Sequence, residues 1–550
     1  MIKIQTIPRV LRGSKRFQEI VSTFAKYGLA GWLKNVNVDW LQKHFQSPDG
    51  DRISDLPQGA KLRLALTELG TTFIKLGQIL STRPDLVGPE VMQELAMLQS
   101  GTPADSEEVV RGIIEDELGA SVEELFAEFN GVAAASASIG QVHFATLHDG
   151  TQVVVKVQHA DIEKTIRSDL DIMHAIAQLA ETYSEDARRF KPVDTLEEFS
   201  RALLTELDFT QERRSLDRFA DNFAGDDNVF IPAAYADQSS RRVLTMGKLD
   251  GISLSNAEKL TEQGYDLSLL AERGANIFLE MIFRDGFYHA DPHPGNIFAL
   301  PGSTIGLLDF GMVGRIDEKL REQFEDLMIA ASDQDSLGLC DSICALGSAP
   351  KDLDTDQLRV EMGEYVAIYG GQSLDEFDVG GSLNRMMEIV RRFNILLPSR
   401  VSMLIKVLVM LEGTARELNP QFNLAQILEP HKKMIVKRRL SPVRLMKKAR
   451  RNAADWTRLA EMAPRELADI LNQIKRGRFD VHLEHRKLDV LINRMITGIL
   501  TAALFMGSAS ILSNKVKPTF HEVSIFGFSG CVVAVFMGFH LVRAIRRSRD

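Results

Sequence analysis

The chain has 550 residues, three cysteines and a formal net charge of −10 at pH 7. This length predicts two or three structural units, and a hydrophobic content of 45% is enough for a large buried core. The negative charge argues against a general nucleic-acid-binding protein. Cys340 and Cys344 lie four residues apart, but without further Cys or nearby His they do not make a zinc site. So few cysteines are typical of a protein in a reducing compartment.

The N-terminal segment is basic and carries no long apolar stretch. Residues 1–34 contain Lys3, Arg9, Arg12 and Lys15 among their basic residues, but no continuous apolar core. A secretory signal peptide needs such a core, so this segment is not one. We expect a surface helix or a membrane-facing arm instead. A mitochondrial presequence is the alternative reading.

Residues 60–100 have the apolar spacing of helices. Apolar side chains recur there every three or four residues, at Leu62, Leu66, Leu69, Phe73, Leu76 and Leu80. Lys75 and Gln78 are three residues apart, so they share a different helical face. The pattern therefore predicts helices that carry a polar pair away from their packed face.

The pattern changes to that of strands after residue 131. Val142–Leu147 and Val153–Val157 are rich in β-branched residues, and the turn pair Asp149-Gly150 lies between them. This arrangement predicts a β-hairpin. Helical periodicity returns over residues 160–220, 255–285 and 315–475.

The C-terminus contains two long apolar segments. Met495–Ser513 has no charged residue, and Val523–Val542 has only His540 as an ionisable group. At ~1.5 Å per residue, each is long enough to cross a ~30 Å hydrocarbon layer. Because the connection Asn514–Glu522 is short, we expect an antiparallel transmembrane hairpin, packed through its small residues. A buried hairpin in a soluble protein is the alternative.

Basic residues predict the orientation of this hairpin. The segment Lys432–Arg451 holds ten basic residues and no acid, and the C-terminal tail is also basic, whereas the loop between the helices has only Lys515 and Lys517. Both hairpin ends should therefore face the cytoplasm, with two helices in the inner (cytoplasmic) membrane and the large domain on the cytoplasmic side. We expect the run to contact anionic lipid headgroups. A nucleic-acid patch and a solvated linker are the alternatives.

One short motif carries the spacing of a kinase catalytic loop. The motif is His289-Ala-Asp291-Pro-His293-Pro-Gly-Asn296, in which an Asn follows an Asp by five residues. In kinases the Asp accepts a hydroxyl proton and the Asn binds magnesium. An apolar strand then ends in Asp309-Phe-Gly, thirteen residues after Asn296, and supplies a second metal carboxylate. A metal cluster of His289, Asp291 and His293 is the alternative, but it leaves Asn296 and Asp309 unexplained.

The other half of an ATP site is expected upstream. Val153–Val157 includes Lys156 and matches the kinase strand whose lysine holds the nucleotide phosphates. A glycine-rich loop should precede it, but residues 132–142 have alanine and serine in place of most glycines. A Cβ atom at these positions restricts the backbone near the phosphates. We therefore expect nucleotide binding with a different phosphate geometry.

These motifs together resemble the UbiB family of atypical kinase-like proteins over roughly residues 60–545. The resemblance rests on the catalytic motifs above and on four further matches: Lys75-Leu-Gly-Gln78 for the family's Lys-x-Gly-Gln signature, the alanine-rich loop Ala133–Val142, Glu206-Leu-Asp208 for its Glu-x-Asp motif, and Glu212 for the glutamate that pairs with Lys156. The C-terminal hairpin resembles that of bacterial members.

The resemblance implies a fold and a set of roles. The fold is α+β, a protein-kinase-like bilobal fold with a helical N-terminal extension and a C-terminal transmembrane hairpin. Lys75 and Gln78 would lie on the extension that covers the active site, with Glu206 and Asp208 facing it, and these four would act in catalysis with Asp291. Asn296 and Asp309 would bind the metal. The nucleotide would contact Lys156, Glu212 and the loop residues Ala134, Ala135, Ser136, Ala137, Ser138, Ile139, Gly140, Gln141 and Val142.

The resemblance also implies a function. It predicts a membrane-bound atypical kinase or ATPase that uses ATP and Mg²⁺ and supports ubiquinone biosynthesis. We expect little protein kinase activity in trans, because Lys75 occupies the place of a protein substrate and no Ala-Pro-Glu follows Gly311. The expected partners are anionic membrane lipids, a prenylated quinone precursor and enzymes of quinone biosynthesis, but no nucleic acid. A small-molecule or lipid phosphotransferase and a lipid-handling pseudokinase scaffold are the alternatives.

The predicted domain organisation follows from these segments. We expect a basic arm, the helical extension, a kinase-like N-lobe and C-lobe, a juxtamembrane segment, and the hairpin with its basic tail. Their predicted bounds are, in the same order, residues 1–60, 61–130, 131–250, 251–440, 441–490 and 491–550.

Overall fold

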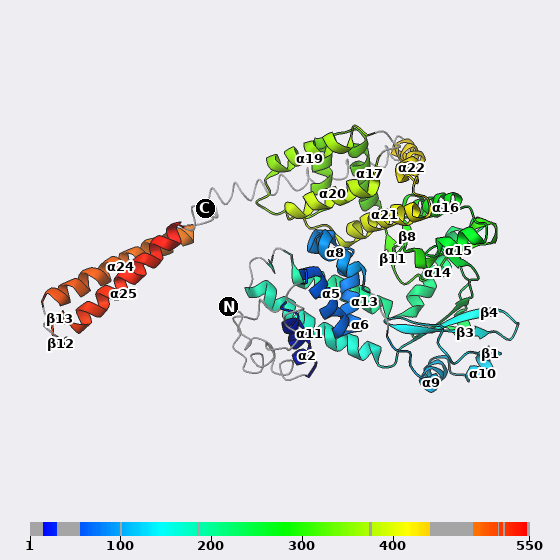
Figure 1. The fold of residues 1–550 in the computed structure, drawn as a ribbon, viewed down its shortest axis with the longest axis horizontal. Helices are drawn as coiled ribbons and strands as arrows, with labels where there is room; N and C mark the ends of the chain where they lie inside the picture. Colours follow the sequence, from blue (N-terminus) through cyan, green and yellow to red (C-terminus); the bar gives the residue numbers. More distant parts are fainter. Residues whose placement is uncertain are drawn as a thin grey trace, which may run out of the picture. The chain divides into compact units, whose positions relative to one another are not determined.

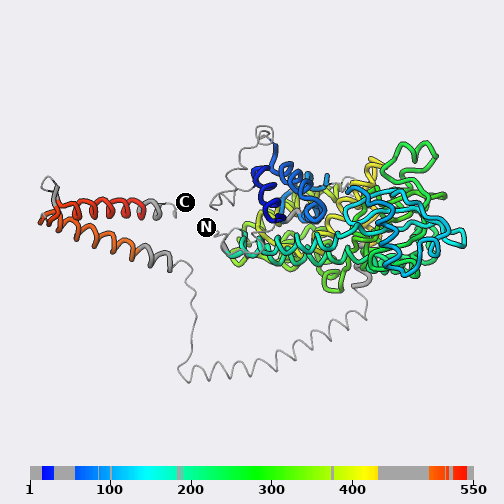
Figure 2. The backbone as a smooth tube through the Cα atoms, turned by 90° about the horizontal axis from the view of Figure 1, so that it is seen from below, coloured from blue at the N-terminus to red at the C-terminus, as the bar shows by residue number. Residues whose placement is uncertain are grey.

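The computed structural model describes most of the chain in two units. The described residues are 15–29, 56–98, 102–183, 187–188, 190–372, 377–439, 488–514, 516–520 and 523–546. They fall into a large unit within residues 1–441 and a small unit within residues 442–550 (Figure 1 and Figure 2).

The large unit contains a five-stranded antiparallel sheet built on the predicted hairpin. β3 (Gly140–Thr146) and β4 (Gln152–Gln158) pair over their full lengths, which confirms the hairpin. β4 lies between β3 and β6, and its valines are buried on both faces. The other strands are β1 (Glu128–Phe129), β2 (Ala135–Ser136) and β6 (Val243–Gly247).

Helices pack on this N-lobe sheet through two separate apolar cores. Val153, Val155 and Val157 pack with α9 (Glu107–Leu118) and α10 (Val122–Leu125) in the smaller core. Val154 belongs to the main core, where it lies with residues of α14 (Phe209–Asn222). Because successive residues of β4 point to opposite faces, each face of the strand contributes to a different core.

Residues 56–98 are helical, as predicted, but in four pieces. Gly70 makes the first break because its φ of +88° is a conformation that other residues rarely adopt. Gly77 allows close helix packing, since a Cβ atom there would lie 2.2 Å from Leu98 Cδ1 and 2.9 Å from Leu66 Cδ1. The four helices are α5 (Gln58–Leu69), α6 (Thr71–Leu80), α7 (Pro84–Val87) and α8 (Pro89–Ala96).

A described part of the N-terminal arm packs on this extension. α2 (Lys15–Lys26) buries one apolar face, and its Arg16 forms an ion pair of 2.7 Å with Asp169. The Arg16 guanidinium also donates to the carbonyl of Leu69, at the end of α5. The helix is therefore an amphipathic surface helix held by the main core. Residues 1–14 and 30–55 of the predicted arm lie outside the described residues.

Two longer helices connect the extension to the N-lobe. α11 (Ile162–Tyr183) follows β4 directly, and α13 (Pro192–Glu206) leads into α14. Both contact α6 of the extension. The helical prediction for residues 160–220 is therefore confirmed, and it places the extension against the helices that follow the hairpin.

The C-lobe begins with short strands and continues as helices. β8 (Phe287–His289) pairs with β11 (Val313–Arg315), and a mixed sheet has the order β5-β10-β9-β7. Its strands are β5 (Val229–Phe230), β7 (Ile252–Ser253), β9 (Ile297–Leu300) and β10 (Thr304–Leu307). The helices are α15 (Ala257–Glu262), α16 (Leu267–Glu280) with a π-helical turn at Met281–Asp285, α17 (Glu318–Ser332), α18 (Ser336–Leu346), α19 (Thr355–Tyr369), α20 (Val379–Arg392), α21 (Ser399–Leu418) and α22 (Leu424–Arg439).

The small unit is a helical hairpin. α24 (Leu488–Ser513) packs against α25 (Ile525–Arg546), and Figure 2 shows the two running side by side. The short strands β12 (Thr519–Phe520) and β13 (Val523–Ser524) lie between them. Close packing uses small residues, because a Cβ atom at Gly530 would lie 2.1 Å from Ser508 Oγ.

The hairpin meets part of the membrane prediction. Within the described residues, Met495–Ser513 is long and apolar enough to cross a membrane, whereas the apolar part of α25, Ile525–Leu541, is shorter. The basic run begins within α22, but its side chains from Lys432 onward lie outside the described part of the structure. The predicted juxtamembrane segment lies almost entirely outside it as well.

Candidate active site

Lys156 is held by a buried carboxylate. Its Nζ donates to both carboxylate oxygens of Glu212, at 3.1 Å and 2.9 Å. β4 supplies the lysine and α14 supplies the glutamate, whose side chain is only 5% exposed. The predicted pair is therefore formed, and it fixes α14 relative to the sheet.

Asp309 lies next to this pair in an unusual backbone conformation. Its Oδ1 is 3.6 Å from Lys156 Nζ, and its φ is +57°. Aspartate tolerates this left-handed region better than most residues, and strain of this kind is often found at functional sites. The side chain is 57% exposed, so the carboxylate faces the open side of the site.

Phe310, the residue after Asp309, is buried and holds Asp309 in place. Its ring is 1% exposed and lies 5.2 Å from the Phe219 ring of α14 and 5.5 Å from the His289 ring, centre to centre. The same packing therefore positions the Asp309 carboxylate, the helix of Glu212 and the start of the loop that carries Asp291. Burial of this phenyl ring makes the three parts one structural unit.

The catalytic loop is ordered by hydrogen bonds between its own residues. Asn296 Nδ2 donates to Asp291 Oδ2 at 2.9 Å, and the Asp291 N–H donates to His289 Nδ1 at 3.2 Å. The other ring nitrogen of His289 faces the carbonyl of Leu308 at 3.0 Å. Because both ring nitrogens are occupied, His289 has no lone pair for a metal. The alternative cluster of His289, Asp291 and His293 is therefore not supported.

The same loop is joined to the strand that carries Asp309. The N–H of Leu308 donates to the carbonyl of Asn296 at 2.9 Å, and Leu307 lies opposite Ile297 in the sheet. Asn296 and Asp309 are thus brought to one end of a strand pair. The amide nitrogen of Asn296 is used by Asp291, which leaves its amide oxygen for a ligand.

Electrostatic interactions among Lys156, Glu212 and Asp309 set the protonation states of these groups. Burial acts to lower the pKa of Lys156, but the carboxylates of Asp309 and Glu212 outweigh it and raise the pKa above its usual value. Burial raises the pKa of Glu212, and the Lys156 ammonium offsets part of that rise. The Lys156 ammonium lowers the pKa of Asp309 to about 2. Lys156 and Asp309 are therefore both charged at neutral pH.

Lys75 of the extension reaches this charged cluster. Its Nζ forms a short ion pair with Glu206, and both side chains are largely buried. The Lys75 ammonium also acts to lower the pKa of Asp309, and Glu206 acts on Lys156 and Glu212. The extension therefore contributes a second cation to a site that already contains Lys156.

Two of the predicted catalytic residues have other contacts. The Gln78 amide donates to the carbonyl of Leu98 at 3.2 Å and so holds the end of the extension. Asp208 is the N-cap of α14, where it accepts from the Thr210 N–H at 3.1 Å and from the Thr210 hydroxyl at 2.6 Å. These contacts of Asp208 lie within its own helix, and its role toward the extension stays a prediction. Its cap fixes the start of the helix that carries Glu212.

The alanine-rich loop is tied to its neighbouring strand. The N–H groups of Ala134 and Ala137 donate to the carbonyls of Val142 and Gly140, at 2.8 Å and 2.9 Å. They are thus already used, unlike those of an open phosphate-binding loop. Gly140 keeps its glycine because a Cβ atom there would lie 2.4 Å from the carbonyl oxygen of Val157.

The remaining residues of this loop divide between surface and core. Ala135 and Ala137 are exposed, and Ser136 and Val142 are partly buried. Ser138, Ile139 and Gln141 are buried, so their side chains support the fold and only their backbone remains for a nucleotide.

Sequence reasoning missed three residues that hold this loop, which are His159, Asp105 and Thr102. His159 faces the Asp105 carboxylate through Nδ1 at 2.9 Å and the Ala137 carbonyl through Nε2 at 3.0 Å. The side-chain oxygen of Gln141 accepts from the N–H of Asp105 at 2.6 Å, and Ser136 Oγ donates to the carbonyl of Thr102. No local sequence pattern predicts this clamp, because Thr102 and Asp105 are about thirty residues or more away from the loop residues and His159 that they contact.

Lys406 was also missed, although the sequence holds a signal for it. It is a single lysine within the otherwise uncharged run Val401–Leu411, on α21. Its charge interacts with Asp291 of the catalytic loop. A lone charge on the packed part of an apolar helix is a recognisable pattern.

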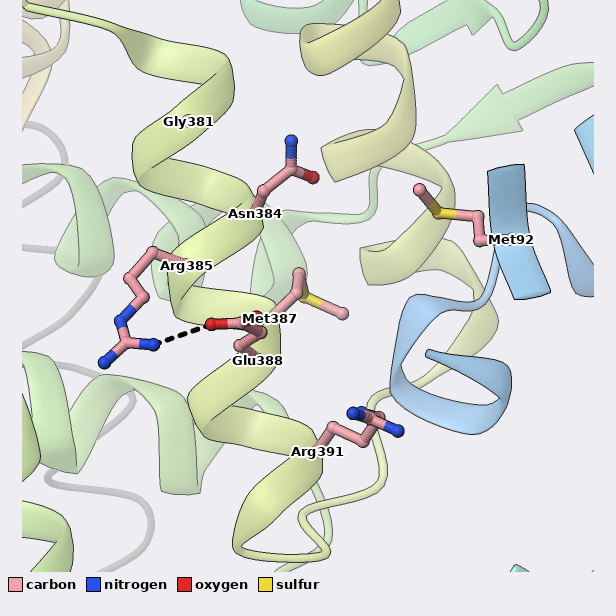
Figure 3. Close-up of a pocket in the computed structure, with 7 residues that line it drawn as sticks. All are labelled: Met92, Gly381, Asn384, Arg385, Met387, Glu388 and Arg391. Carbon is pink, nitrogen blue, oxygen red and sulfur yellow. Dashed lines mark hydrogen bonds and ion pairs between the residues drawn. The ribbon is translucent and has the colours of Figure 1, made fainter. Parts of the chain in front are cut away.

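The described residues also line a cavity that is separate from this site. It has a volume of about 240 Å³ and lies between α8 and α20 (Figure 3). Figure 3 shows Met92 on α8 facing the helix that carries Asn384, Met387 and Arg391, where Arg385 pairs with Glu388. None of the predicted site residues lines it.

The assembled residues fit a magnesium nucleotide. A carboxylate and an amide oxygen, as in Asp309 and Asn296, are the oxygen ligands that Mg²⁺ prefers. Lys156 is charged and held where a phosphate oxygen would replace its weaker contact with Asp309. Asp291 lies on the same loop as Asn296, with one carboxylate oxygen free of that amide.

Comparison with known proteins agrees with this arrangement. Residues 97–342 match the ABC1 atypical kinase-like domain, residues 362–423 match the UbiB helical domain, and residues 482–547 match the ABC1/UbiB kinase-like C-terminal domain. The predicted protein-kinase-like bilobal fold is thereby confirmed.

Individual relatives cover most of the chain. "Probable protein kinase UbiB" of Actinobacillus pleuropneumoniae serotype 7 is 34% identical over 440 residues, which are 76% of this chain and 79% of that protein. "Uncharacterized protein in hydrogenase 1 5'region" of Clostridium pasteurianum is 30% identical over 546 residues, 97% and 99% of the two chains. A solved structure, of Rv3197 from Mycobacterium tuberculosis with erythromycin, matches at 24% identity and a TM-score of 0.44, over 66% of this chain and 93% of that one. On the strength of the matched domains and curated relatives, the chain belongs to the UbiB family of atypical kinase-like proteins.

Proposed function

We propose that this protein is a membrane-bound atypical kinase or ATPase that uses Mg-ATP and supports ubiquinone biosynthesis. The observation that carries the proposal is the joined set of Lys156, Glu212 and Asp309, with Asn296 and Asp291 on the adjoining loop. These groups come from three separate parts of the chain. Structural needs alone do not require that one lysine and three carboxylates be brought together in this way.

Each residue then has a role toward the nucleotide. Asp309 and Asn296 would hold Mg²⁺, which neutralises charge on the phosphates when it is bound. Lys156, kept in place by Glu212, would hold phosphate oxygens. Asp291 would accept a proton from the attacking hydroxyl or water, since one of its carboxylate oxygens is not used by Asn296.

The helical extension is the reason to propose that protein kinase activity in trans is low. Lys75 and Glu206 form their ion pair beside the site, and Lys75 acts on Asp309. A peptide would have to displace a largely buried ion pair to reach the phosphates, and breaking such a pair is costly. A small or flexible acceptor has a lower barrier to entry.

The membrane part of the proposal rests on the hairpin and the basic run. Met495–Ser513 is suited to a membrane span, and many side chains of α24 and α25 are exposed and apolar. The basic residues of Lys432–Arg451 would attract anionic lipid at ~1 kcal/mol each. A prenyl tail costs ~0.8 kcal/mol per CH₂ group to expose to water, so presenting such a molecule to enzymes requires work. We therefore propose a prenylated quinone precursor as the molecule served.

The test measures ATP turnover and its products. Full-length protein is assayed with and without Mg²⁺, anionic vesicles and a prenylated phenol, and quinones are quantified in a deletion strain. We expect Mg²⁺-dependent hydrolysis that vesicles and phenol stimulate, and a quinone deficiency in the strain. A phosphorylated phenol would identify a small-molecule phosphotransferase. Unchanged turnover together with normal quinone levels would rule the proposal out.

A further inference from the structure

The turn of the alanine-rich loop is held by a side chain from outside the loop. It runs from Ala137 to Gly140, between β2 and β3, and the N–H of Ala137 donates to the carbonyl of Gly140 at 2.9 Å. A four-residue turn commonly closes with a bond from its last N–H to its first carbonyl. In the described part of the chain, the Ala137 carbonyl receives no such bond from Gly140. It faces His159 Nε2 at 3.0 Å instead.

His159 is buried and contacts the turn at two places. It follows β4 directly, its backbone N–H donates to the carbonyl of Ile139 at 2.9 Å, and its ring faces the carbonyl of Ala137. A carbonyl and the N–H of the next residue point in opposite directions across a trans peptide bond. Holding the Ala137 carbonyl therefore also fixes the direction of the Ser138 N–H.

Asp105 holds the ring of His159 from its other side. The carboxylate oxygen Oδ2 faces His159 Nδ1 at 2.9 Å and accepts from the N–H of Ala160 at 3.2 Å. The N–H of Asp105 donates to the side-chain oxygen of Gln141 on β3 at 2.6 Å. Asp105 is thus fixed to β3, and the ring connects it to the carbonyl of Ala137.

Two successive backbone N–H groups of this turn have no acceptor among the described residues. They belong to Ser138 and Ile139, which are both buried. Buried N–H groups without an acceptor are rare in folded proteins, and each one calls for an explanation. Phosphate oxygens are acceptors that successive N–H groups bind well. The turn therefore keeps two donors that the protein does not use itself.

Stability alone gives no reason for this arrangement. A turn that closes on itself satisfies its own carbonyl and N–H groups and needs no buried histidine. Here a polar side chain is buried to hold one carbonyl, while two N–H groups stay without an acceptor.

We propose that His159 and Asp105 are positioning residues for the nucleotide. The ring of His159 holds the Ala137 carbonyl, and the Asp105 carboxylate holds the ring. The turn thereby keeps the N–H groups of Ser138 and Ile139 in place for phosphate oxygens. This inference rests on the proposed function, because it gives both residues a part in binding ATP. It adds to the site two side chains that come from outside the loop.

The test uses two substitutions of His159 that each keep one of its contacts. The amide nitrogen of glutamine lies near the place of Nε2, so His159→Gln still donates to the carbonyl of Ala137. The amide nitrogen of asparagine lies near the place of Nδ1, so His159→Asn still donates to Asp105 but loses the turn. Full-length proteins are measured for KM for ATP, kcat and melting temperature. His159→Asn should raise KM by ~10-fold or more and His159→Gln by less than ~3-fold, with smaller changes in kcat.

The matched control is Thr245→Val on β6 of the same sheet. The Thr245 side chain is buried, and its hydroxyl donates to the carbonyl of Gln238 at 2.7 Å. It lies opposite Val155, which packs in the smaller core, whereas Lys156 points to the other face of the sheet. This variant loses one buried hydrogen bond, so it should melt earlier and keep the KM of wild type.

A second variant tests the anchor of the ring. Asp105→Ala removes the carboxylate that holds His159 but keeps the backbone N–H that donates to Gln141. It should raise KM by ~3-fold or more. If His159→Asn does not fold, this variant decides the question, and an unchanged KM overturns the inference.

The possible failures are distinguishable. A wild-type protein that neither binds nor turns over ATP contradicts the proposed function, and this inference falls with it. If wild type turns over ATP and His159→Asn keeps KM within ~2-fold, the proposed function stands and the positioning role is wrong. If His159→Asn and His159→Gln raise KM equally and melt equally early, His159 is structural and the inference is overturned.

Discussion

The pair of Lys156 and Glu212 offers a prediction whose size follows from the structure. Glu212→Gln keeps the volume of the side chain but removes its charge. Among the described carboxylates, Asp309, at 3.6 Å, would then be the one ion-pair partner left to Lys156. Breaking a buried pair by removing one partner costs ~3–5 kcal/mol, and the remaining partner places the cost near ~3 kcal/mol. The large unit spans about 440 residues, so its entropy of unfolding is near ~0.9 kcal/mol/K and the expected fall in melting temperature is roughly 3–4 °C.

The same substitution should weaken nucleotide binding. Without Glu212, Lys156 is drawn toward Asp309 and competes with the metal, so we expect Mg-ATP affinity to fall by ~10-fold or more, which is ~1.4 kcal/mol. Melting is followed in detergent, and affinity is measured by titration with a fluorescent nucleotide. Asp169→Asn is the matched control: Asp169 is a buried carboxylate paired with Arg16, outside the site. It should lower the melting temperature and leave affinity unchanged. If Glu212→Gln binds nucleotide as tightly as wild type, the pair does not organise the site.

Three further predictions concern the extension, the loop and pH. Lys75→Met should raise phosphorylation of generic peptides above the wild-type level, because it frees the opening beside Glu206; an unchanged level would mean that the ion pair is not the barrier. Ala135→Gly should change nucleotide affinity, since it restores backbone freedom near the phosphates; identical binding isotherms would contradict this. In the folded protein the pKa of Asp309 is lowered to about 2, below its ordinary value near ~3.9. The ionised carboxylate therefore stabilises the fold above pH ~3.9, and this stabilisation is lost as the pH falls through the pKa of the folded state. The melting-temperature difference between wild type and Asp309→Asn should therefore shrink between pH ~4 and ~2, and a constant difference would count against the coupling to Lys156.

Much of the site could be predicted because its residues lie in short, regular segments. The run of valines around Lys156 indicates a strand, and Asp291, Asn296 and Asp309 keep a fixed spacing along a loop and the strand pair that follows it. Pairing with Glu212 came from the family resemblance, since no local pattern joins residues 56 positions apart.

Other parts depended on tertiary contacts that periodicity does not encode. Gln78 was expected at the active site, but its amide is used to hold the carbonyl of Leu98. Asp208 was expected to face the extension, although its position directly before a helix is a recognisable N-cap signal. Lys406 falls within a run that reads as core helix, and its relation to Asp291 arises only when α21 packs on β11.

The central claim, that this site binds a magnesium nucleotide, is tested most directly by one titration. Nucleotide affinity of the full-length protein is measured with and without Mg²⁺ for wild type and for Asp309→Asn. We expect Mg²⁺ to increase the affinity of wild type by at least ~10-fold, and we expect Asp309→Asn to lose this dependence while it remains folded. Wild-type affinity and full Mg²⁺ dependence in the Asp309→Asn protein would show that Asp309 does not hold the metal of a nucleotide complex.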